Sequence, residues 1–508
     1  RVNFFEQAQI SASTSGSGEG GNLTLTAPES ITLNGNGILA ATSEGAASGR
    51  AGDVLLASEK LTITNGMRVS AATNSTNPAA SGGNLTVETA QLNLTDGSSL
   101  EAGTTGTAPG GNLTIQPNDN GQTLAVNVTG GATVSAASSG SGKGGTLSVN
   151  APESITLNGN GILAATSEGA ASGRAGDVLL GSEKLTITNG MRVSAATNSS
   201  NPAASGGNLT VETAQLNLTD GSSLEAGTTG NAPGGNLTIQ PNDNGQTLAV
   251  NVSGGATVSA ASSGSGKGGT LNINAPESIN LTGNGSVISA ETTGQGAGGD
   301  LTLTTGNLAV EDGGKITVSS TGSGLAGDLN INANSIYLNN AAKITADTTG
   351  GGGNIFGRSP LFLLRNQSSI TTNAKGLGIG GGNIDLDALN GFIIAVPEEN
   401  SDISANSVDF RGGKVKISAQ GIFGIKSRNT PTLESDITAT GASPQFNGSV
   451  ELNTPGIDPN SGFVELPTIA VATEVAQVCD SPGYAQSSFT ITGRGGLPPN
   501  PTKDVLPN

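Results

Sequence analysis

The stretch Gly20-Gly21-Asn22-Leu23-Thr24 (GGNLT) returns along the whole chain and decides its fold. The same mark, a glycine pair followed by asparagine, stands at Gly82-Gly83-Asn84, Gly110-Gly111-Asn112, Gly206-Gly207-Asn208, Gly234-Gly235-Asn236, Gly352-Gly353-Asn354 and Gly381-Gly382-Asn383. Together with variants such as Gly52-Asp53 and Gly144-Gly145-Thr146, successive marks lie 26 to 34 residues apart. A period in this range is typical of repeat architectures, in which length measures the number of units.

Each unit contains three short alternations of apolar and polar residues. In the first unit the apolar residues are Leu23/Leu25, Ile31/Leu33 and Leu39/Ala41, which is the pattern of half-buried strands. The second and third alternations keep a constant offset of six residues, as from Leu33 to Leu39, and Asn-Gly or Asp-Gly usually stands between them. A constant offset predicts a constant corner. The third corner is a loop of variable length rich in Gly, Ser, Thr and Ala, such as 42–49.

Three strands and three corners predict one triangular coil, and stacked coils give parallel sheets. We therefore predict an all-β fold, a right-handed parallel β-helix of about 14–16 coils over residues 1–455, with a Pro-rich and largely irregular tail over 456–508. Antiparallel hairpins are the alternative, because Asn-Gly corners suit them too, but hairpins need no 30-residue register. We expect the Asn after each glycine pair to stack into a hydrogen-bonded ladder.

A longer period lies over the short one. Residues 22–145 and 146–269 align without a gap at an offset of 124 and differ at eight positions. A third copy starts at Thr270 and soon diverges, and the longest units carry an insert, Pro117 to Gly121 (PNDNG). Duplication of four coils as a block favours a function that tolerates changes in length.

The composition predicts a narrow core. Hydrophobic residues are 34% of the chain and aromatic residues 2%, so Leu, Val, Ile and Ala must fill the interior. All ten Phe lie outside residues 6–353. We interpret 354–455 as divergent terminal coils in which large side chains widen or cap the core.

Several classes of partner and chemistry are disfavoured. Net charge is −18, and Lys and Arg never cluster, so we expect no nucleic-acid partner. No apolar stretch is long enough to span a membrane. The chain has no His and a single Cys, Cys479, which we interpret as an incidental residue rather than a free or intermolecular thiol. Because 10–20 matches 134–144, the chain begins inside a repeat, and we expect it to be the C-terminal portion of a longer protein.

The search for chemistry leaves few candidates. Two acid pairs exist, Asp385/Asp387 and Glu398/Glu399, and glycoside hydrolysis would need two carboxylates in one groove. Asp385 and Asp387 share one face of a strand, and a solvated outer face is the favoured interpretation. Gly298-Gly299-Asp300 lacks the rest of a calcium-binding repeat, so turn chemistry is the better interpretation. Outward Thr pairs such as Thr24/Thr26 are too irregular for a binding array. We therefore predict no catalytic, cofactor-binding or metal-binding residues, and no enzyme.

The last third carries more specific motifs, in this order: 362–374 (FLLRNQSSITTNA), 381–384 (GGNI), 401–405 (SDISA), 413–423 (GKVKISAQGIF), 434–440 (ESDITAT), 456–467 (GIDPNSGFVELP), 478–479 (VC) and 488–501 (SFTITGRGGLPPNP). This order resembles the C-terminal region of large cyanobacterial exoproteins related to filamentous haemagglutinin, the secreted partners of two-partner secretion systems. The resemblance covers about 355–501. It implies Sec export and an N-terminal domain that docks on an outer-membrane β-barrel transporter. That domain is not in this sequence, so its recognition residues cannot be placed.

Together these features predict a secreted or cell-surface structural protein that mediates attachment to surfaces or other cells. Extracellular polysaccharide or cell-surface ligands are the expected partners, beside the transporter. The alternatives are a polysaccharide-degrading lyase or hydrolase of the β-helix type, and a passive sheath or spacer protein.

Overall fold

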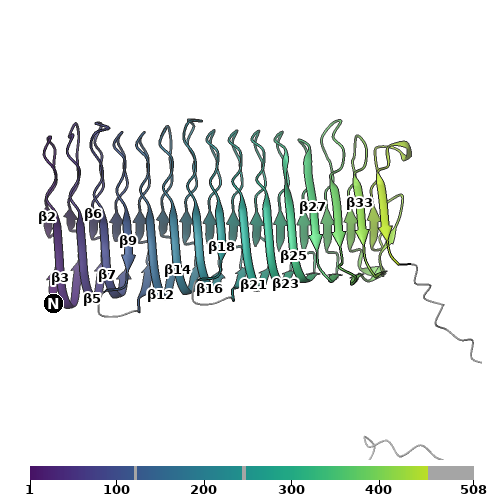
Figure 1. Ribbon diagram of the computed structural model, residues 1–508, viewed down its shortest axis with the longest axis horizontal. Helices are drawn as coiled ribbons and strands as arrows, with labels where there is room; N and C mark the ends of the chain where they lie inside the picture. The colour runs from purple at the N-terminus through teal and green to yellow at the C-terminus, as the bar shows by residue number, and fades with distance from the viewer. Residues whose placement is uncertain (119–122, 243–246, 456–508) are drawn as a thin grey trace, which may run out of the picture. The chain divides into compact units, whose positions relative to one another are not determined.

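The computed structural model describes residues 1–118, 123–242 and 247–455. The chain divides into two units, Arg1–Pro455 and Gly456–Asn508, and the second lies outside the described residues, together with Cys479 and the irregular tail expected there. The first unit is an all-β solenoid of stacked parallel coils (Figure 1), which confirms the predicted fold class. The helices of its described part are two single turns, η1 (Pro397–Glu399) and η2 (Pro444–Phe446).

Two parallel sheets run the length of the solenoid. The 16-stranded sheet contains one short strand from each coil, with β35 added in the last coil, and agrees with the expected 14–16 coils. Its strands are β2 (Gln9–Ser11), β4 (Ile38–Ala40), β6 (Arg68–Ser70), β8 (Ser99–Glu101), β11 (Thr133–Ser135), β13 (Ile162–Ala164), β15 (Arg192–Ser194), β17 (Ser223–Glu225), β20 (Thr257–Ser259), β22 (Val287–Ser289), β24 (Lys315–Thr317), β26 (Lys343–Thr345), β29 (Ser369–Thr371), β32 (Asp402–Ser404), β35 (Lys426–Ser427) and β36 (Asp436–Thr438).

The 21-stranded sheet contains the first two alternations of each unit. In most coils they form one long strand: β3 (Leu23–Asn34), β5 (Val54–Thr64), β7 (Leu85–Leu94), β12 (Leu147–Asn158), β14 (Val178–Thr188), β16 (Leu209–Leu218), β21 (Leu271–Thr282), β23 (Leu301–Glu311) and β25 (Ala326–Asn339). In the others they are separate: β9 (Leu113–Gln116) and β10 (Ala125–Thr129), β18 (Leu237–Gln240) and β19 (Ala249–Ser253), β27 (Gly352–Arg358) and β28 (Leu361–Leu364), β30 (Asn383–Asp387) and β31 (Phe392–Ile394), β33 (Lys414–Ser418) and β34 (Gly421–Phe423). Partial coils supply β1 (Val2–Phe4) and β37 (Ser449–Asn453).

The expectation of three separate strands in every coil is therefore wrong. The link between the first two alternations is short and contains no turn pair in most coils, so the chain bends within one strand. In β3 the register against β5 shifts between Ala27 and Ser30, the mark of a bulge. The strands separate where the PNDNG insert follows Gln116. Most of that insert lies outside the described residues.

The constant corner is confirmed. Asn65 and Gly66 have φ of 60° and 81°, and Asp96 and Gly97 have φ of 53° and 70°. Two successive residues in the left-handed region form a tight turn, which Asn, Asp and Gly adopt at the lowest cost.

The third corner is not the loosely defined loop that its variable composition suggested. After each short strand the chain runs outward and returns, and we call this segment the arm (upper part of Figure 1). Gly83 N–H donates to Ala71 O across the base of one arm at 2.8 Å. Inside the arms, buried hydroxyls span the two legs: Thr104 Oγ1 donates to Ala108 O at 2.6 Å and Ser138 Oγ to Gly142 O at 2.5 Å. Small residues allow the legs to approach each other, so the arms are ordered and stacked.

The glycine pairs mark the seam where each arm returns to the next long strand. A Cβ on Gly82 would lie 2.4 Å from Gly111 N of the following coil, and one on Gly83 would lie 1.9 Å from Gly52 O of the preceding coil. The second place is glycine in the equivalent coils, as at Gly52 and Gly176, whereas the first also accepts alanine, as at Ala51 and Ala175.

The predicted ladder beside the seam is confirmed. Asn22 Oδ1 accepts the backbone N–H of Asp53 at 2.8 Å, and Asp53 Oδ1 accepts that of Asn84 at 2.7 Å. The same bond from one coil to the next recurs at Asn84–Asn112, Asn112–Thr146, Asp177–Asn208, Asp300–Asp328 and Asn354–Asn383. Asp and Asn are interchangeable in this ladder because each supplies the accepting oxygen.

The core is one continuous row of Leu, Val, Ile and Ala, as predicted. The expectation that Phe widens or caps it is wrong for all but one of the Phe in the terminal coils. Phe362 is 1% exposed, and it fits because Gly357 leaves space: a Cβ there would lie 3.2 Å from the Phe362 ring. The other Phe of these coils lie on the surface: Phe356, Phe392, Phe410, Phe423 and Phe446.

The seam predicts a sharp contrast between two glycines. A Cβ on Gly207 would lie 1.7 Å from Gly176 O, whereas one on Gly181 would meet its nearest neighbour at 3.5 Å. Gly207→Ala is expected to lower the free energy of unfolding by about 2–4 kcal/mol. Gly181→Ala is the matched control and should be neutral, because Ala57 occupies the equivalent place in the first block. Urea unfolding followed by circular dichroism measures both, and equal values would contradict the steric explanation.

The acidic members of the ladder predict a pH dependence. Partial burial acts to raise the pKa of Asp53, but hydrogen bonds from Arg50 and from Asn84 N–H outweigh it and hold that pKa below its usual value. The pKa of Asp177 is lowered in the same way, against burial, by Arg174 and Asn208 N–H. A lowered folded-state pKa stabilises the fold above the unfolded value, about 3.9, and that contribution is lost as pH falls below it.

Replacing both carboxylates removes this contribution while keeping the ladder. In Asp53→Asn/Asp177→Asn, the loss of unfolding free energy between about pH 5 and pH 2 should be smaller than in the unmodified chain. Urea titrations at several pH values test this. An unchanged pH profile would show that the two carboxylates titrate alike in the folded and unfolded chain.

Candidate functional site: two outward-facing grooves

A long groove follows the angle between the 16-stranded sheet and the arms. Two hollows of about 470 and 550 Å³ compose it, and they share Thr166 and Glu168. The lining runs without a break from Ile38 to Thr293, and we call it the arm groove. Its surface consists of the outward side chains of the short strands and of the first leg of each arm.

Small hydroxyl side chains dominate the arm groove, with carboxylates at intervals. Thr105, Thr133 and Ser139 line its first part, and Thr229, Thr257 and Ser263 occupy the equivalent places 124 residues later. Much of the lining is therefore repeated at the offset of 124 residues, although the first hollow extends to Glu168 in the second block and the second hollow extends to Thr293 beyond it.

The charges of the arm groove are largely paired. Arg68 Nη2 lies 2.6 Å from Glu101 Oε2, and the copied pair Arg192–Glu225 has 2.7 Å between Nε and Oε2. Glu168 has no basic partner among the described residues, and Thr166 Oγ1 donates to it at 2.8 Å. This surface offers many hydrogen-bonding groups and a weakly negative character.

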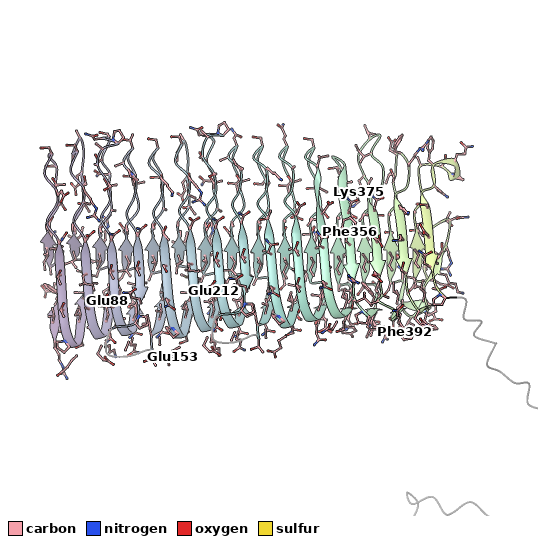
Figure 2. The ribbon with its side chains drawn as sticks, viewed as in Figure 1. Glu88, Glu153, Glu212, Phe356, Lys375 and Phe392 are labelled. Atoms are coloured by element: carbon pink, nitrogen blue, oxygen red, sulfur yellow. The ribbon has the colours of Figure 1, made fainter. Side chains whose placement is uncertain are left out.

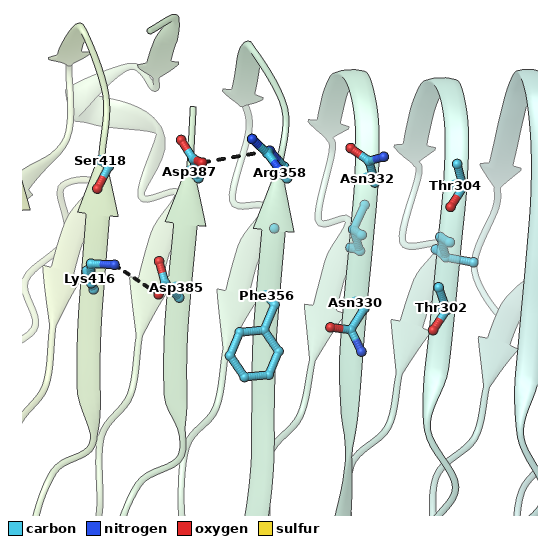
Figure 3. Close-up of a pocket in the computed structure, with 13 residues that line it drawn as sticks. Thr302, Thr304, Asn330, Asn332, Phe356, Arg358, Asp385, Asp387, Lys416 and Ser418 are labelled. Atoms are coloured by element: carbon cyan, nitrogen blue, oxygen red, sulfur yellow. Dashed lines mark hydrogen bonds and ion pairs between the residues drawn. The ribbon is translucent and has the colours of Figure 1, made fainter. Parts of the chain in front are cut away.

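A second, shallower groove of about 460 Å³ crosses the outer face of β23, β25, β27, β30 and β33. We call it the sheet groove. Two rows of outward residues form it: Thr302, Asn330, Phe356, Asp385 and Lys416 in one, and Thr304, Asn332, Arg358, Asp387 and Ser418 in the other (Figure 3). The parallel register places each residue beside its equivalent in the next coil.

The predicted acid pair Asp385/Asp387 lies in the sheet groove, on one face of β30 as expected. Each carboxylate is paired across the coils: Asp385 Oδ2 lies 3.2 Å from Lys416 Nζ, and Asp387 Oδ2 lies 3.8 Å from Arg358 Nε (Figure 3). These pairs are half exposed, so the acids face solvent but are not free of cations.

The other acid pair lies elsewhere. Glu398 and Glu399 belong to η1, at a corner of the terminal coils. Glu399 receives two hydrogen bonds of 2.7 Å from Arg365 and one of 2.9 Å from Asn366 N–H. The bond from Arg365 is the main reason that the pKa of Glu399 lies below its usual value. Glu399 is therefore a structural clamp between two coils.

The part of the chain that the structure describes contains no group of three or more His, Cys, Asp or Glu side chains placed to hold a metal ion. Asp300, in the nearest approach to a calcium motif, is a member of the seam ladder. In the same residues no helix is long and apolar enough to cross a membrane.

Two features of these surfaces were missed from the sequence. A loop of variable length at the third corner does not by itself predict the arm groove, although the repeated Ser/Thr spacing is a usable signal. Phe356 was assigned to the core or cap, although its place between Ile355 and Gly357 alternates as an outward residue. Its register partners on the neighbouring strands, Asn330 and Asp385, are polar, which also indicates that Phe356 faces solvent.

Comparison with protein-family models, with curated proteins and with solved structures found no match.

The ion pairs of the sheet groove predict a small effect on stability. Asp385→Asn/Asp387→Asn should change the free energy of unfolding by less than about 1 kcal/mol per pair, because exposed ion pairs contribute little. Urea unfolding measures it. Glu399→Gln is the contrasting variant, since it breaks the two-bond clamp to Arg365, and should cost more. A large loss in the Asp double variant would assign a structural role to both acids.

Proposed function

We propose that this protein is a secreted or cell-surface structural rod that mediates attachment to surfaces or to other cells. The observation that carries the proposal is the arm groove, an extended polar surface most of whose lining is repeated by the duplication of four coils. A solenoid presents the same surface repeatedly, which suits adhesion by many weak contacts.

The chemistry of the arm groove favours extracellular polysaccharide as the ligand. Hydroxyls of Thr105 and Thr133 offer both donors and acceptors, and Asn74 adds an amide. Such groups match the hydroxyls of sugars. A net charge of −18 disfavours nucleic acid, whose phosphates it repels.

Export by two-partner secretion is part of the proposal and rests on the motifs of the last third. An outer-membrane β-barrel transporter would be the partner, through an N-terminal domain that is not in this sequence. A transporter gene beside the gene of this protein would support this route.

We also propose that the rod is not an enzyme. The support is that Asp385 and Asp387 are each paired with a cation and that Glu399 is clamped by Arg365. The whole chain contains no His, the commonest general base. Release of reducing ends or unsaturated products from polysaccharides by the purified chain would contradict this.

The duplicated block allows a direct test of adhesion. Deleting 146–269 joins Gly145 to Thr270, and the strand after the joint keeps its register, since Leu271 pairs with Leu237 as Leu147 does with Leu113. Loss of one groove copy should lower apparent affinity for a polysaccharide-coated surface by about tenfold, because avidity falls with valency. Surface plasmon resonance on immobilised matrix polysaccharide measures it.

A full-length variant separates adhesion from length. It carries four substitutions that remove outward hydroxyls from both copies and keep the shape of the side chains: Thr105→Val, Thr133→Val, Thr229→Val and Thr257→Val. None of these hydroxyls bonds to another described residue, so the fold should survive. The proposal expects weaker attachment in this variant as well. Unchanged attachment in both variants would favour a passive sheath or spacer.

A further inference from the structure

The sheet groove has an exposed aromatic ring at its centre. Phe356 is 41% exposed on β27, between Asn330 on β25 and Asp385 on β30. Figure 3 looks onto the outer face of these strands and shows the ring nearly face-on, so that it lies flat with one face toward solvent. A flat ring in this position is a platform on which an apolar face of a ligand can stack.

Core packing does not require this ring. The residues at the same place in neighbouring coils are Thr302, Asn330, Asp385 and Lys416, which are all polar. In each duplicated block one coil of four has an aliphatic residue at this place, Leu55 or Leu179, and the other three have Thr or Ser. Singly exposed apolar side chains are common at protein surfaces, and Phe356 differs from them because it lines a groove of about 460 Å³ together with polar groups.

Hydrogen-bonding groups surround the platform on both sides. Toward the N-terminal coils lie Asn330 and Asn332, whose amides make no hydrogen bond to other described residues. Toward the C-terminal coils lie Asp385 and Asp387, whose carboxylates keep acceptor positions beyond their single ion pairs. An aromatic face flanked by amides and carboxylates complements a sugar ring, which has apolar C–H faces and a polar rim.

We propose that the sheet groove is a saccharide-binding site for a neutral, pyranose-based polysaccharide, with one sugar ring stacked on Phe356 and the chain lying across the strands along the stack of coils. The site spans five coils from Thr302 to Ser418, a length suited to a polymer rather than a single sugar.

The charges that line the sheet groove favour a neutral polysaccharide over an acidic one as its ligand. Two cations and two anions line the groove, and each cation faces an anion, so the groove offers no net attraction to uronates or sulfates. The chain as a whole carries −18 and repels polyanions. This site differs from the arm groove in having an aromatic centre, and it does not depend on adhesion through the arm groove.

The test compares two phenylalanines of equal exposure. Phe392 on β31 is also 41% exposed but lies outside the groove, near the lower margin of Figure 2. Binding of soluble neutral oligosaccharides, from both β-linked and α-linked glucans, is measured by isothermal titration calorimetry with oligogalacturonate as the acidic probe. Phe356→Ala should weaken binding of the neutral probe by about tenfold or more, and Phe392→Ala should leave it unchanged.

A second variant guards against a folding defect. Asn330→Ala/Asn332→Ala removes free amides from the rim without touching the ring and should weaken binding several-fold. Circular dichroism confirms that each variant is folded. Equal affinity of Phe356→Ala and the unmodified chain, no binding of any neutral probe, or tighter binding of oligogalacturonate would each overturn the proposal. Surface attachment that survives Phe356→Ala would leave the arm groove as the adhesive surface, so the two proposals fail separately.

Discussion

Backbone meets backbone at the second glycine of each seam with no space for a side chain, and the rest of the solenoid depends on this contact. Gly82 and Gly83 are each blocked by main-chain atoms, one by the following coil and the other by the preceding coil. The seam therefore sets the distance between coils at the point where each arm returns. Parallel ladders, stacked arms and the Asn/Asp bonds all require that distance to be constant, because hydrogen bonds tolerate only small changes in separation.

Because every coil has the same cross-section, the sequence varies mainly at residues that face outward. The inward rows accept Leu, Val, Ile and Ala along the whole length, and the one large ring inside, Phe362, is accommodated by the loss of a side chain at Gly357. Outward residues carry no such restriction. Both grooves are made of outward residues. They differ in the side of the coil on which they lie and in the outward residues that stand there in place of Thr or Asn.

The sequence predicted the period, the parallel solenoid, the constant Asn-Gly or Asp-Gly corner and the seam ladder, because each follows from a repeated local pattern. It failed where two elements meet in space. The bend at Ala27–Ser30 contains Pro28 but no turn pair such as Asn-Gly. The arms appear as low-complexity loops unless the hydroxyl of Thr104 is known to reach Ala108 O. Phe356 was misplaced because composition alone suggested a core residue. Its outward direction follows only from aligning β27 with its neighbours.

The two grooves would also change differently as the chain grows by duplication. The block 22–145 begins and ends at the seam, so copying it inserts four complete coils and extends the arm groove without disturbing register. The sheet groove lies beyond the duplicated blocks, and its aromatic centre is not copied with them. Under the two proposals, length would set the number of weak contacts made by the arm groove, while recognition at Phe356 would remain a single site. This separation explains how near-identical repeats and a divergent, aromatic-bearing end are compatible in one rod.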